Sequence, residues 1–593
     1  MTPMVHVALV GALAALLSYV FTDVSKRVAL RLGVVAAPRP ERWHRRPVPL
    51  LGGIAILAGV LAAVAIMPQA SREIWIVLAG AVTLFLVGLA DDVRPLSPQI
   101  KLVSQVAVAS VIAGLGLQLH LTGQPIADFV LTLLWIVGIT NAFNLLDNMD
   151  GLAAGIAVIT VGFRLVFYIA DGNVAAAGFA AAIAGAATGF LIHNLRPASV
   201  FMGDAGSLFL GSLVAGLSLV GGYPYSRSVF SVLLFPVIVL LVPIFDTTLV
   251  AVTRLLAGRS VAAGGRDHSS HRLVGIGLTE RKAVLALYAL STCSGLVALF
   301  TYRYGLTYGS VLIVFLLLGA GVLGVSLARF VVYEDEPGAR QASLARLEGD
   351  FVFLRPLAII AIDVTLIVVA YYSAYLLRFE EQFDLYRQVF LDSLPYVIVC
   401  KLVIFAALGL HQPIWRYVGV RDLLRIVWAV SLGSLVSVVV VVYAYRFVDF
   451  SRAVFILDWL LLLVGMSGIR LFSRVFGELA GQAASPRRRV LVYGAGNGGV
   501  LTVREIQGNA GLERVVVGFL DDDRSKLRSR VLGVPVFGGV DALDQTVRRL
   551  SIDEVVVSSA KVPAERIDVI RTQCESLGIT LSRASLRLER PAP

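Results

Sequence analysis

Apolar runs, each close to the length of a membrane-crossing helix, follow one another along residues 1–475. A helix needs about 20 apolar residues to cross the hydrocarbon core of a bilayer. We therefore expect a polytopic α-helical membrane protein with about fifteen transmembrane helices. The expected spans are 4–22, 50–67, 74–91, 100–117, 127–143, 152–170, 174–193, 207–221, 229–253, 281–301, 306–330, 354–377, 393–410, 425–446 and 453–475.

Charge then predicts the orientation of these spans. Basic residues favour the cytoplasmic side, and the loop after the first run holds Lys26, Arg27, Arg31, Arg39, Arg42, Arg45 and Arg46. That loop is expected inside, so the N-terminus is expected outside. Alternation places further inside loops at 91–101, 144–151, 194–206, 254–280 and 331–353.

The apolar rhythm breaks twice, which divides the chain into four parts. Residues 1–330 form the first membrane part, and the charged stretch 331–353 is expected to be a cytoplasmic linker. Residues 354–480 are expected to form a four-helix membrane domain. From 486 to 593 strand-like runs such as 490–493 alternate with helical patterns, which predicts a cytoplasmic Rossmann-like α/β domain.

Composition supports the membrane interpretation. The chain has 593 residues, of which 57% are hydrophobic and only 15% charged, whereas soluble domains carry roughly 25% charge. The net charge of +11 belongs to the expected inside loops, so we expect membrane lipids and no nucleic acid as partners. Cys293, Cys400 and Cys574 match no metal or disulfide spacing. No basic segment precedes the first apolar run, which argues against a cleaved signal peptide.

Carboxylates stand at the ends of several apolar runs, all on the expected cytoplasmic side. Asp91 and Asp92 end the third span, where the helix macrodipole opposes negative charge. Asn144, Asp147 and Asp150 are spaced to share one face of a helix. A solvated or capped helix end is the simpler explanation for each cluster alone. A bound cation would neutralise the negative charge of both clusters together.

A second polar cluster precedes the apolar run at 207–221. Asp204 lies between Gly203 and Gly206, with Ser207 next along the chain. Asp is a favoured helix N-cap, which is the simpler interpretation. A helix N-terminus also favours phosphate, so Asp204 and Ser207 could hold Mg²⁺ together with a phosphate oxygen.

The loop at residues 264–272 is basic and rich in glycine. Arg266, His268, His271 and Arg272 suit a clamp for a diphosphate. Two histidines alone make a poor zinc site, because a third ligand is not evident nearby. An ordinary inside loop would explain the arginines but not the histidines.

Taken together, residues 1–330 resemble the polyprenyl-phosphate N-acetylhexosamine-1-phosphate transferase family. Two positions differ from its usual pattern, Asn148 in place of glycine and the spacing of the two histidines, and they leave the sugar open. The resemblance rests on Asp91-Asp92, on residues 141–153 (NAFNLLDNMDGLA), on residues 201–207 (FMGDAGS), on residues 267–272 (DHSSHR), and on residues 44–49 (HRRPVP) with Gly52-Gly53.

The resemblance implies transfer of a hexosamine-1-phosphate from a UDP-sugar to polyprenyl (undecaprenyl) phosphate, with release of UMP, at the bacterial inner membrane. Mg²⁺, or Mn²⁺ in its place, would be the cofactor. Asp204 would be the principal metal ligand, and Asp91 and Asp92 would share the metal or act on the lipid phosphate. The remaining roles are orientation of the nucleotide by Asn144, Asp147 and Asp150, and substrate contacts from His44, Ser207, Arg266, His268, His271 and Arg272.

The terminal domain carries the pattern G-x-G-x-x-G after a strand-like run, at Gly494, Gly496 and Gly499. Asp521 follows the next strand, where a ribose-binding acid belongs. NAD(P) or a nucleotide-sugar is therefore the expected ligand, and a tight packing turn is the alternative. Residues 350–593 also resemble the front half of membrane-bound nucleotide-sugar dehydratases. The tyrosine of their Tyr-x-x-x-Lys motif is missing after Tyr493, so the resemblance implies a sensor or scaffold.

Two other functions stay open on the sequence. A transporter or flippase of lipid-linked sugars would have charged residues and broken helices at mid-membrane. A nucleotide-sensing scaffold with an inactive first half would have lost its acids, yet Asp91, Asp147 and Asp204 are present. A homodimer is compatible with either function.

Overall fold

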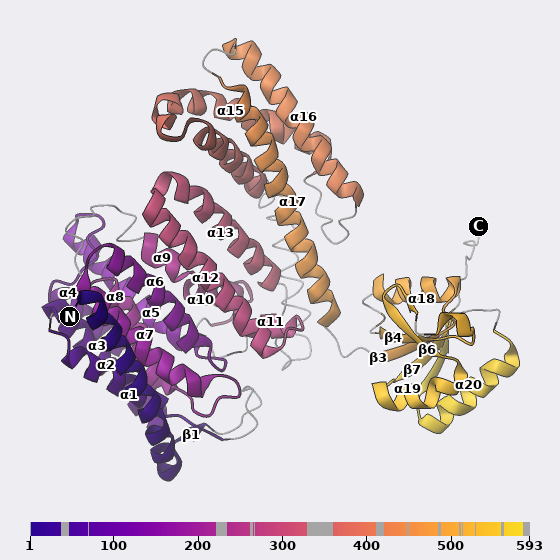
Figure 1. Cartoon of the computed structure of the whole chain (residues 1–593), viewed down its shortest axis with the longest axis horizontal. Helices are drawn as coiled ribbons and strands as arrows, with labels where there is room; N and C mark the ends of the chain where they lie inside the picture. The colour runs from indigo at the N-terminus through magenta and orange to yellow at the C-terminus, as the bar shows by residue number, and fades with distance from the viewer. Residues whose placement is uncertain are drawn as a thin grey trace. The chain divides into compact units, whose positions relative to one another are not determined.

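The computed structural model describes residues 2–36, 47–68, 70–220, 234–260, 265, 267–328, 360–410, 420–446, 450–483, 488–508, 512, 514–527, 529–558 and 562–584. The chain forms two compact units, Met1–Ala480 and Gly481–Pro593 (Figure 1). The predicted linker 331–353 lies outside the described residues.

The first membrane part is helical apart from a two-stranded ribbon (Figure 1). Its elements are α1 (Pro3–Leu32), β1 (Val35–Ala36), β2 (Val48–Pro49), α2 (Gly52–Ala65), α3 (Arg72–Val93), α4 (Pro98–Gly114), α5 (Pro125–Leu146), α6 (Leu152–Ala170), α7 (Val174–Asn194), α8 (Gly203–Leu217), α9 (Phe235–Val239), α10 (Leu241–Leu256), α11 (Ser269–Gly275), α12 (Glu280–Tyr304) and α13 (Leu306–Ala328).

The predicted membrane fold is confirmed, although the predicted number of spans is not. Within the described residues, eleven helices are long and apolar enough to cross a membrane. The helices α2, α4 and α8 are apolar but shorter. The predicted span 229–253 falls partly outside the described residues, and its remainder is two helices that meet at Leu240.

Close packing of α8 brings its N-terminus against two other helices. A Cβ added at Gly88 of α3 would lie 2.4 Å from the carbonyl oxygen of Asp204. A Cβ at Gly53 of α2 would lie 2.5 Å from Cα of Gly206. Glycine at these two positions therefore lets α2 and α3 approach the first turn of α8.

The other end of α8 is held by a buried arginine. Fifteen residues give a helix about 22 Å long, which is shorter than the hydrocarbon core of roughly 30 Å. Arg164 of α6 is 0% exposed and donates to the carbonyl of Leu217 at 3.2 Å and to Ser218 Oγ at 3.0 Å. The arginine therefore donates to a carbonyl at the C-terminal end of α8, where the helix macrodipole favours a positive charge.

The second membrane part contains the helix Ile360–Phe379, the short η2 (Glu380–Gln382), α15 (Phe383–Ala407), α16 (Val420–Tyr445) and α17 (Arg452–Ala483). Lys401 of α15 and Asp458 of α17 form an ion pair of 2.5 Å, and their side chains are 0% and 2% exposed. This buried pair lies within the expected spans 393–410 and 453–475, unlike the acids at span ends in the first membrane part. Pairing makes the two charges tolerable inside an apolar helix cluster.

The terminal unit is an α/β domain, as predicted. Its sheet has the order β5-β6-β4-β3-β7-β8 and is parallel except for β5 against β6. The strands β3, β4, β6, β7 and β8 therefore follow the order 3-2-1-4-5, which is typical of a Rossmann fold. Its elements are β3 (Arg488–Tyr493), α18 (Asn497–Gly508), β4 (Arg514–Leu520), η5 (Arg524–Lys526), β5 (Arg530–Val531), β6 (Val534–Gly538), η6 (Val540–Ala542), α19 (Leu543–Leu550), β7 (Glu554–Val557), α20 (Ala564–Leu577) and β8 (Thr580–Arg583).

Candidate functional site

Two carboxylates and a lysine form the centre of the first site. Asp91 lies near the C-terminal end of α3, Lys101 lies in the first turn of α4, and Asp204 lies in the first turn of α8. Lys101 Nζ is 3.0 Å from Asp91 Oδ2 and 2.7 Å from Asp204 Oδ2. The ammonium thus occupies the position between two carboxylates that a bridging cation would take.

Asp92 turns to the backbone of α8 instead. Its Oδ1 accepts from the Asp204 N–H at 2.8 Å, and its Oδ2 accepts from the Ala205 N–H at 3.0 Å. Gly203 has a φ of 70°, and a Cβ there would lie 2.4 Å from Asp92 Oδ2. Glycine is therefore required for Asp92 to reach the N-terminus of α8, where negative charge is favourable.

Sequence reasoning missed Lys101. It was part of an expected inside loop, and a single lysine at the start of an apolar helix is an ordinary basic anchor. The available signal was the adjacent pair of acids at the end of α3, which requires a positive partner. Lys101 is that partner for Asp91, and the N-terminus of α8 takes this place for Asp92.

The last turn of α5 and the turn that follows it link this centre to a second polar cluster. Asn144 Nδ2 donates to Ser207 Oγ at 2.9 Å, which places both residues beside the first turn of α8. Asn148 Oδ1 accepts from Ser270 Oγ at 2.6 Å. Asp150 Oδ2 accepts from the Ala198 N–H at 3.0 Å.

The prediction that one helical face carries all three polar residues of this segment is wrong. The helix α5 ends at Leu146, so Asp147 is its C-cap and Asp150 lies in the turn beyond. Gly151, with a φ of 77°, starts α6 from a left-handed conformation. Asp147 and Asp150 are both half-buried beside this turn.

The second cluster surrounds Asp246 of α10, which is 1% exposed. Asp246 Oδ2 lies 2.8 Å from His268 Nδ1, and its Oδ1 accepts from both the N–H and the Oγ of Ser269 at 2.6 Å. The ring of His271 lies 6.1 Å from the ring of His268, measured between centroids. The carboxylate thereby fixes the entry into α11 and the orientation of His268.

Arg272, predicted to hold substrate, donates to protein atoms. Its Nε donates to the carbonyl of Asp267 at 2.6 Å, and its Nη2 donates to Thr253 Oγ1 at 2.9 Å. Asp267 in turn forms a two-point ion pair with Arg254 at 2.7 Å. A role for Arg272 in binding substrate therefore stays a prediction.

The two other predicted substrate contacts, His44 and Arg266, lie outside the described residues. In the part of the chain that the structure does describe, no three His, Cys, Asp or Glu side chains converge as a metal-binding group. The donors beside Lys101 and at the first turn of α8 nevertheless fit a hard cation. They are carboxylate, amide and hydroxyl oxygens from Asp91, Asp204, Asn144 and Ser207, and Mg²⁺ prefers oxygen ligands.

The terminal domain contains a separate candidate site at the carboxyl edge of its sheet. The predicted glycine loop joins β3 to α18, and Gly494 has a φ of 98°. A Cβ at Gly499 would lie 1.9 Å from the carbonyl oxygen of Gly494, so this glycine is needed for packing. A Cβ at Gly496 would meet nothing within 4 Å, so the loop is open on that side.

Asp521 follows β4, as predicted for a ribose-binding acid. Its Oδ2 accepts from the Ala495 N–H at 2.7 Å and from Lys526 Nζ at 3.0 Å, which braces the glycine loop. Burial raises the pKa of Asp521, but hydrogen bonds from the Asp523 N–H, Lys526 and the Ala495 N–H outweigh burial and lower it. Ribose binding by Asp521 stays a prediction.

Comparison with known proteins agrees with this division. The family model described as glycosyl transferase family 4 matches residues 74–222, which include the lysine centre. A probable undecaprenyl-phosphate N-acetylglucosaminyl 1-phosphate transferase of Bacillus subtilis is 36% identical over 297 residues, covering 48% of this chain and 82% of that protein. The chain belongs to glycosyl transferase family 4.

Two further family members match the same half of the chain. A decaprenyl-phosphate N-acetylglucosaminephosphotransferase of Mycolicibacterium smegmatis is 36% identical over 324 residues, covering 48% of this chain and 80% of that protein. An undecaprenyl-phosphate alpha-N-acetylglucosaminyl 1-phosphate transferase of Escherichia coli is 28% identical over 320 residues, covering 51% of this chain and 86% of that protein. A second family model, described as a CoA-binding domain, matches residues 406–582 of this family 4 chain.

Proposed function

We propose that the chain transfers N-acetylhexosamine-1-phosphate from a UDP-sugar to polyprenyl phosphate, and so initiates an envelope glycan. The names of its family 4 relatives supply the acceptor class and the N-acetylglucosaminyl 1-phosphate group. The observation that carries the proposal is the meeting of Asp91, Lys101 and Asp204 at the apposed ends of α3, α4 and α8.

The proposed reaction exchanges one phosphoanhydride bond for another. An oxygen of the lipid phosphate attacks the β-phosphorus of the UDP-sugar, and the bond from that phosphorus to the UMP oxygen breaks. UMP leaves with the electron pair, and the lipid diphosphate sugar remains. Because one pyrophosphate bond is lost and one is formed, catalysis depends on positioning and charge neutralisation.

The residues of the lysine centre suit that task. Lys101 supplies a positive charge next to two carboxylates, and the apposed N-terminus of α8 favours a phosphate group. Asn144 and Ser207, hydrogen-bonded to each other, present polar groups at the same helix end. Asp92 holds the backbone of α8 in place.

A divalent cation would be held by Asp91 and Asp204, with Asn144 and Ser207 beside them. When bound, Mg²⁺ would neutralise the charge of the diphosphate. Phosphoglycosyl transferases generally use a divalent metal, and the oxygen donors here fit one. His268, oriented by Asp246, and His271 would face the diphosphate or the uridine end of the donor.

We further propose that the site and the terminal domain face the cytoplasm of a bacterial cell, with the chain in the inner membrane. The basic inside loops support this orientation. Labelling of single cysteines placed at 91–101 and 194–206 tests it, since reagents that cannot cross the membrane should not reach these loops from outside.

The terminal domain is proposed to bind a nucleotide and to act in regulation or assembly. Its glycine loop, open at Gly496, and its Rossmann strand order support nucleotide binding.

Release of UMP by the purified chain tests the transferase directly. The assay uses a panel of UDP-sugars with undecaprenyl phosphate and Mg²⁺, and UDP-N-acetylglucosamine is expected to react. Folded protein that releases UMP from no UDP-sugar would contradict the proposal.

A further inference from the structure

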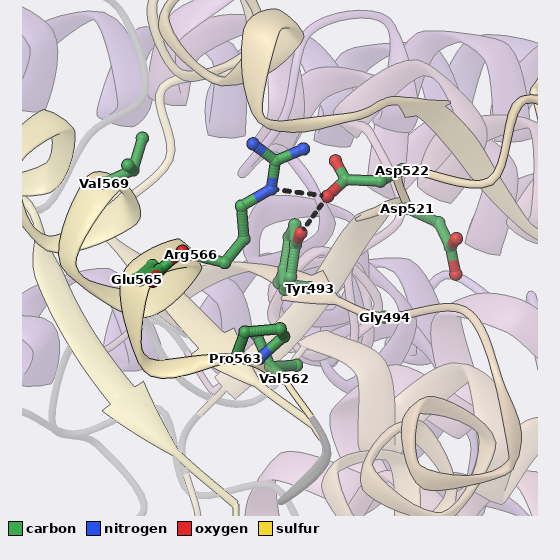
Figure 2. Close-up of a pocket in the computed structure, with 9 residues that line it drawn as sticks. All are labelled: Tyr493, Gly494, Asp521, Asp522, Val562, Pro563, Glu565, Arg566 and Val569. Atoms are coloured by element: carbon green, nitrogen blue, oxygen red, sulfur yellow. Dashed lines mark hydrogen bonds and ion pairs between the residues drawn. The ribbon is translucent and has the colours of Figure 1, made fainter.

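A cavity of about 600 Å³ lies at the carboxyl edge of the terminal sheet. Its wall includes Tyr493 and Gly494 at the end of β3, Asp522 after β4, and Arg566 in the first turn of α20 (Figure 2). In folds of this type, ligands bind in the crevice at the carboxyl ends of the strands, where the strand order reverses. The reversal lies between β3 and β7.

A chain of hydrogen bonds fixes one arginine in this cavity. Tyr493 donates its hydroxyl to Asp522 Oδ2 at 2.5 Å, and Arg566 Nε donates to the same oxygen at 2.8 Å. The Val540 N–H donates to the other oxygen of Asp522 at 3.1 Å. Figure 2 shows one terminal nitrogen of the guanidinium on the side away from Asp522 and the other on the side that faces it. The carboxylate therefore orients the guanidinium without covering its outer edge.

The charges around the cavity leave this arginine able to attract an anion. The carboxylate of Asp521 is balanced by Lys526 at 3.0 Å, and the other carboxylate on the wall, Glu565, is exposed, so solvent screens its repulsion of a phosphate. Arg566 and Asp522 are 46% and 35% exposed, so a ligand has access to the pair. A planar guanidinium held by one carboxylate is the usual donor to a second oxyanion, because its N–H groups form a rigid fork.

We propose that this cavity binds the diphosphate of a nucleotide, with Arg566 as the residue that holds it. Asp522 and Tyr493 are positioning residues for that guanidinium. The proposal rests on the nucleotide-binding role proposed above and names the group that is recognised. The apolar wall formed by Val562, Pro563 and Val569 would accept the base or ribose, and the volume suits a nucleotide.

Nucleotide binding to the full-length chain in detergent tests this assignment. The probes are ADP, UDP, NAD⁺ and CoA, each titrated calorimetrically, with adenosine as the probe that lacks phosphate. Arg566→Met is expected to weaken binding of at least one diphosphate about ten-fold or more, since hydrogen bonds to charged groups are the strong ones. Arg571→Met is the matched control, because Arg571 lies on the same helix and pairs with Asp568 at the surface, outside the cavity wall.

Two more variants separate positioning from folding. Arg566→Lys keeps the charge but not the fork, and should bind the diphosphate less tightly than wild type and more tightly than Arg566→Met. Asp522→Asn should weaken diphosphate binding but not adenosine binding, and Asp522→Glu should restore part of the affinity. The proposal is overturned if no diphosphate binds, or if Arg566→Met leaves every affinity within about two-fold of Arg571→Met. UMP release, measured in parallel, reports on the transferase site alone.

Discussion

Replacing Lys101 by methionine tests the lysine centre most directly. The substitution keeps the length of the side chain and removes the charge that separates Asp91 from Asp204. Two unit charges about 4 Å apart interact by about 4 kcal/mol at an effective dielectric constant of 20. The three side chains are 23%, 13% and 31% exposed, so solvent weakens each contact, and we take about 1.5 kcal/mol for each.

The two contacts together then correspond to about 3 kcal/mol of charge stabilisation. Stabilisation of that size, given by the same ammonium to the charge of the transferred phosphate in the transition state, is a factor of about 10² in rate. We expect UMP release by Lys101→Met to fall by about that factor at every Mg²⁺ concentration. Lys282→Met is the control, because Lys282 is an exposed lysine in the first turn of α12. Thermal midpoints of both variants show whether the fold is retained.

One result would refute the reasoning. If Lys101→Met is folded and its turnover lies within about three-fold of the control, the ammonium takes no part in the reaction. The contacts of 3.0 and 2.7 Å would then only hold α4 against α3 and α8.

Four further predictions concern other parts of the chain. Asp204→Asn should lower UMP release by orders of magnitude, and a Mg²⁺ titration should not restore it; near-normal turnover would contradict its role. Arg164→Met should lower the free energy of unfolding by about 2–4 kcal/mol, because it removes the two hydrogen bonds that a buried charged donor makes to the Leu217 carbonyl and to Ser218 Oγ, and a thermal midpoint equal to wild type would exclude this. Lys401→Met alone should destabilise the membrane part by about 3–5 kcal/mol, whereas adding Asp458→Leu should recover most of the loss; additive losses would contradict a paired burial. Burial raises the pKa of Asp522, but hydrogen bonds from its tyrosine and arginine partners outweigh burial and lower it, so its contribution to stability is present above the ordinary pKa of about 4 and is lost as the pH falls below it. Unfolding of the terminal unit followed against pH checks this, and Asp522→Asn should flatten the acid limb.

Sequence patterns predicted the elements and motifs that depend on local order. Apolar runs of sufficient length gave the membrane helices, and the strand-like runs at 490–493 and 554–557 became β3 and β7. The acids at the ends of α3 and α8 were expected on one side of the membrane, and Lys101 now joins them. These features follow from side-chain periodicity and from charge, which the sequence states directly.

The features that the sequence did not predict depend on contacts between distant segments. In the sequence, Arg164 is an isolated charge in an apolar run. Its role becomes clear from the structure, because α8 is short and ends at a buried position where Arg164 donates to the Leu217 carbonyl. Asp521 and Asp522 are adjacent in the sequence, yet the backbone turns one toward the glycine loop and the other toward Arg566. Neighbouring positions give no local signal for that choice.

The lysine centre shows how a local conflict can position a site. Two acids at the end of α3 are unfavourable there, because the C-terminal end of a helix carries partial negative charge. In the structure the N-terminus of α8 lies against these two acids. Asp92 accepts hydrogen bonds from two backbone N–H groups of α8, and Asp91 pairs with Lys101. Both acids are thus needed to hold the two helix ends together, and the same arrangement leaves Asp204 beside a positive charge. An acid that was misplaced for the stability of α3 alone is therefore well placed for a site that must bring a lipid phosphate and a nucleotide diphosphate to one point.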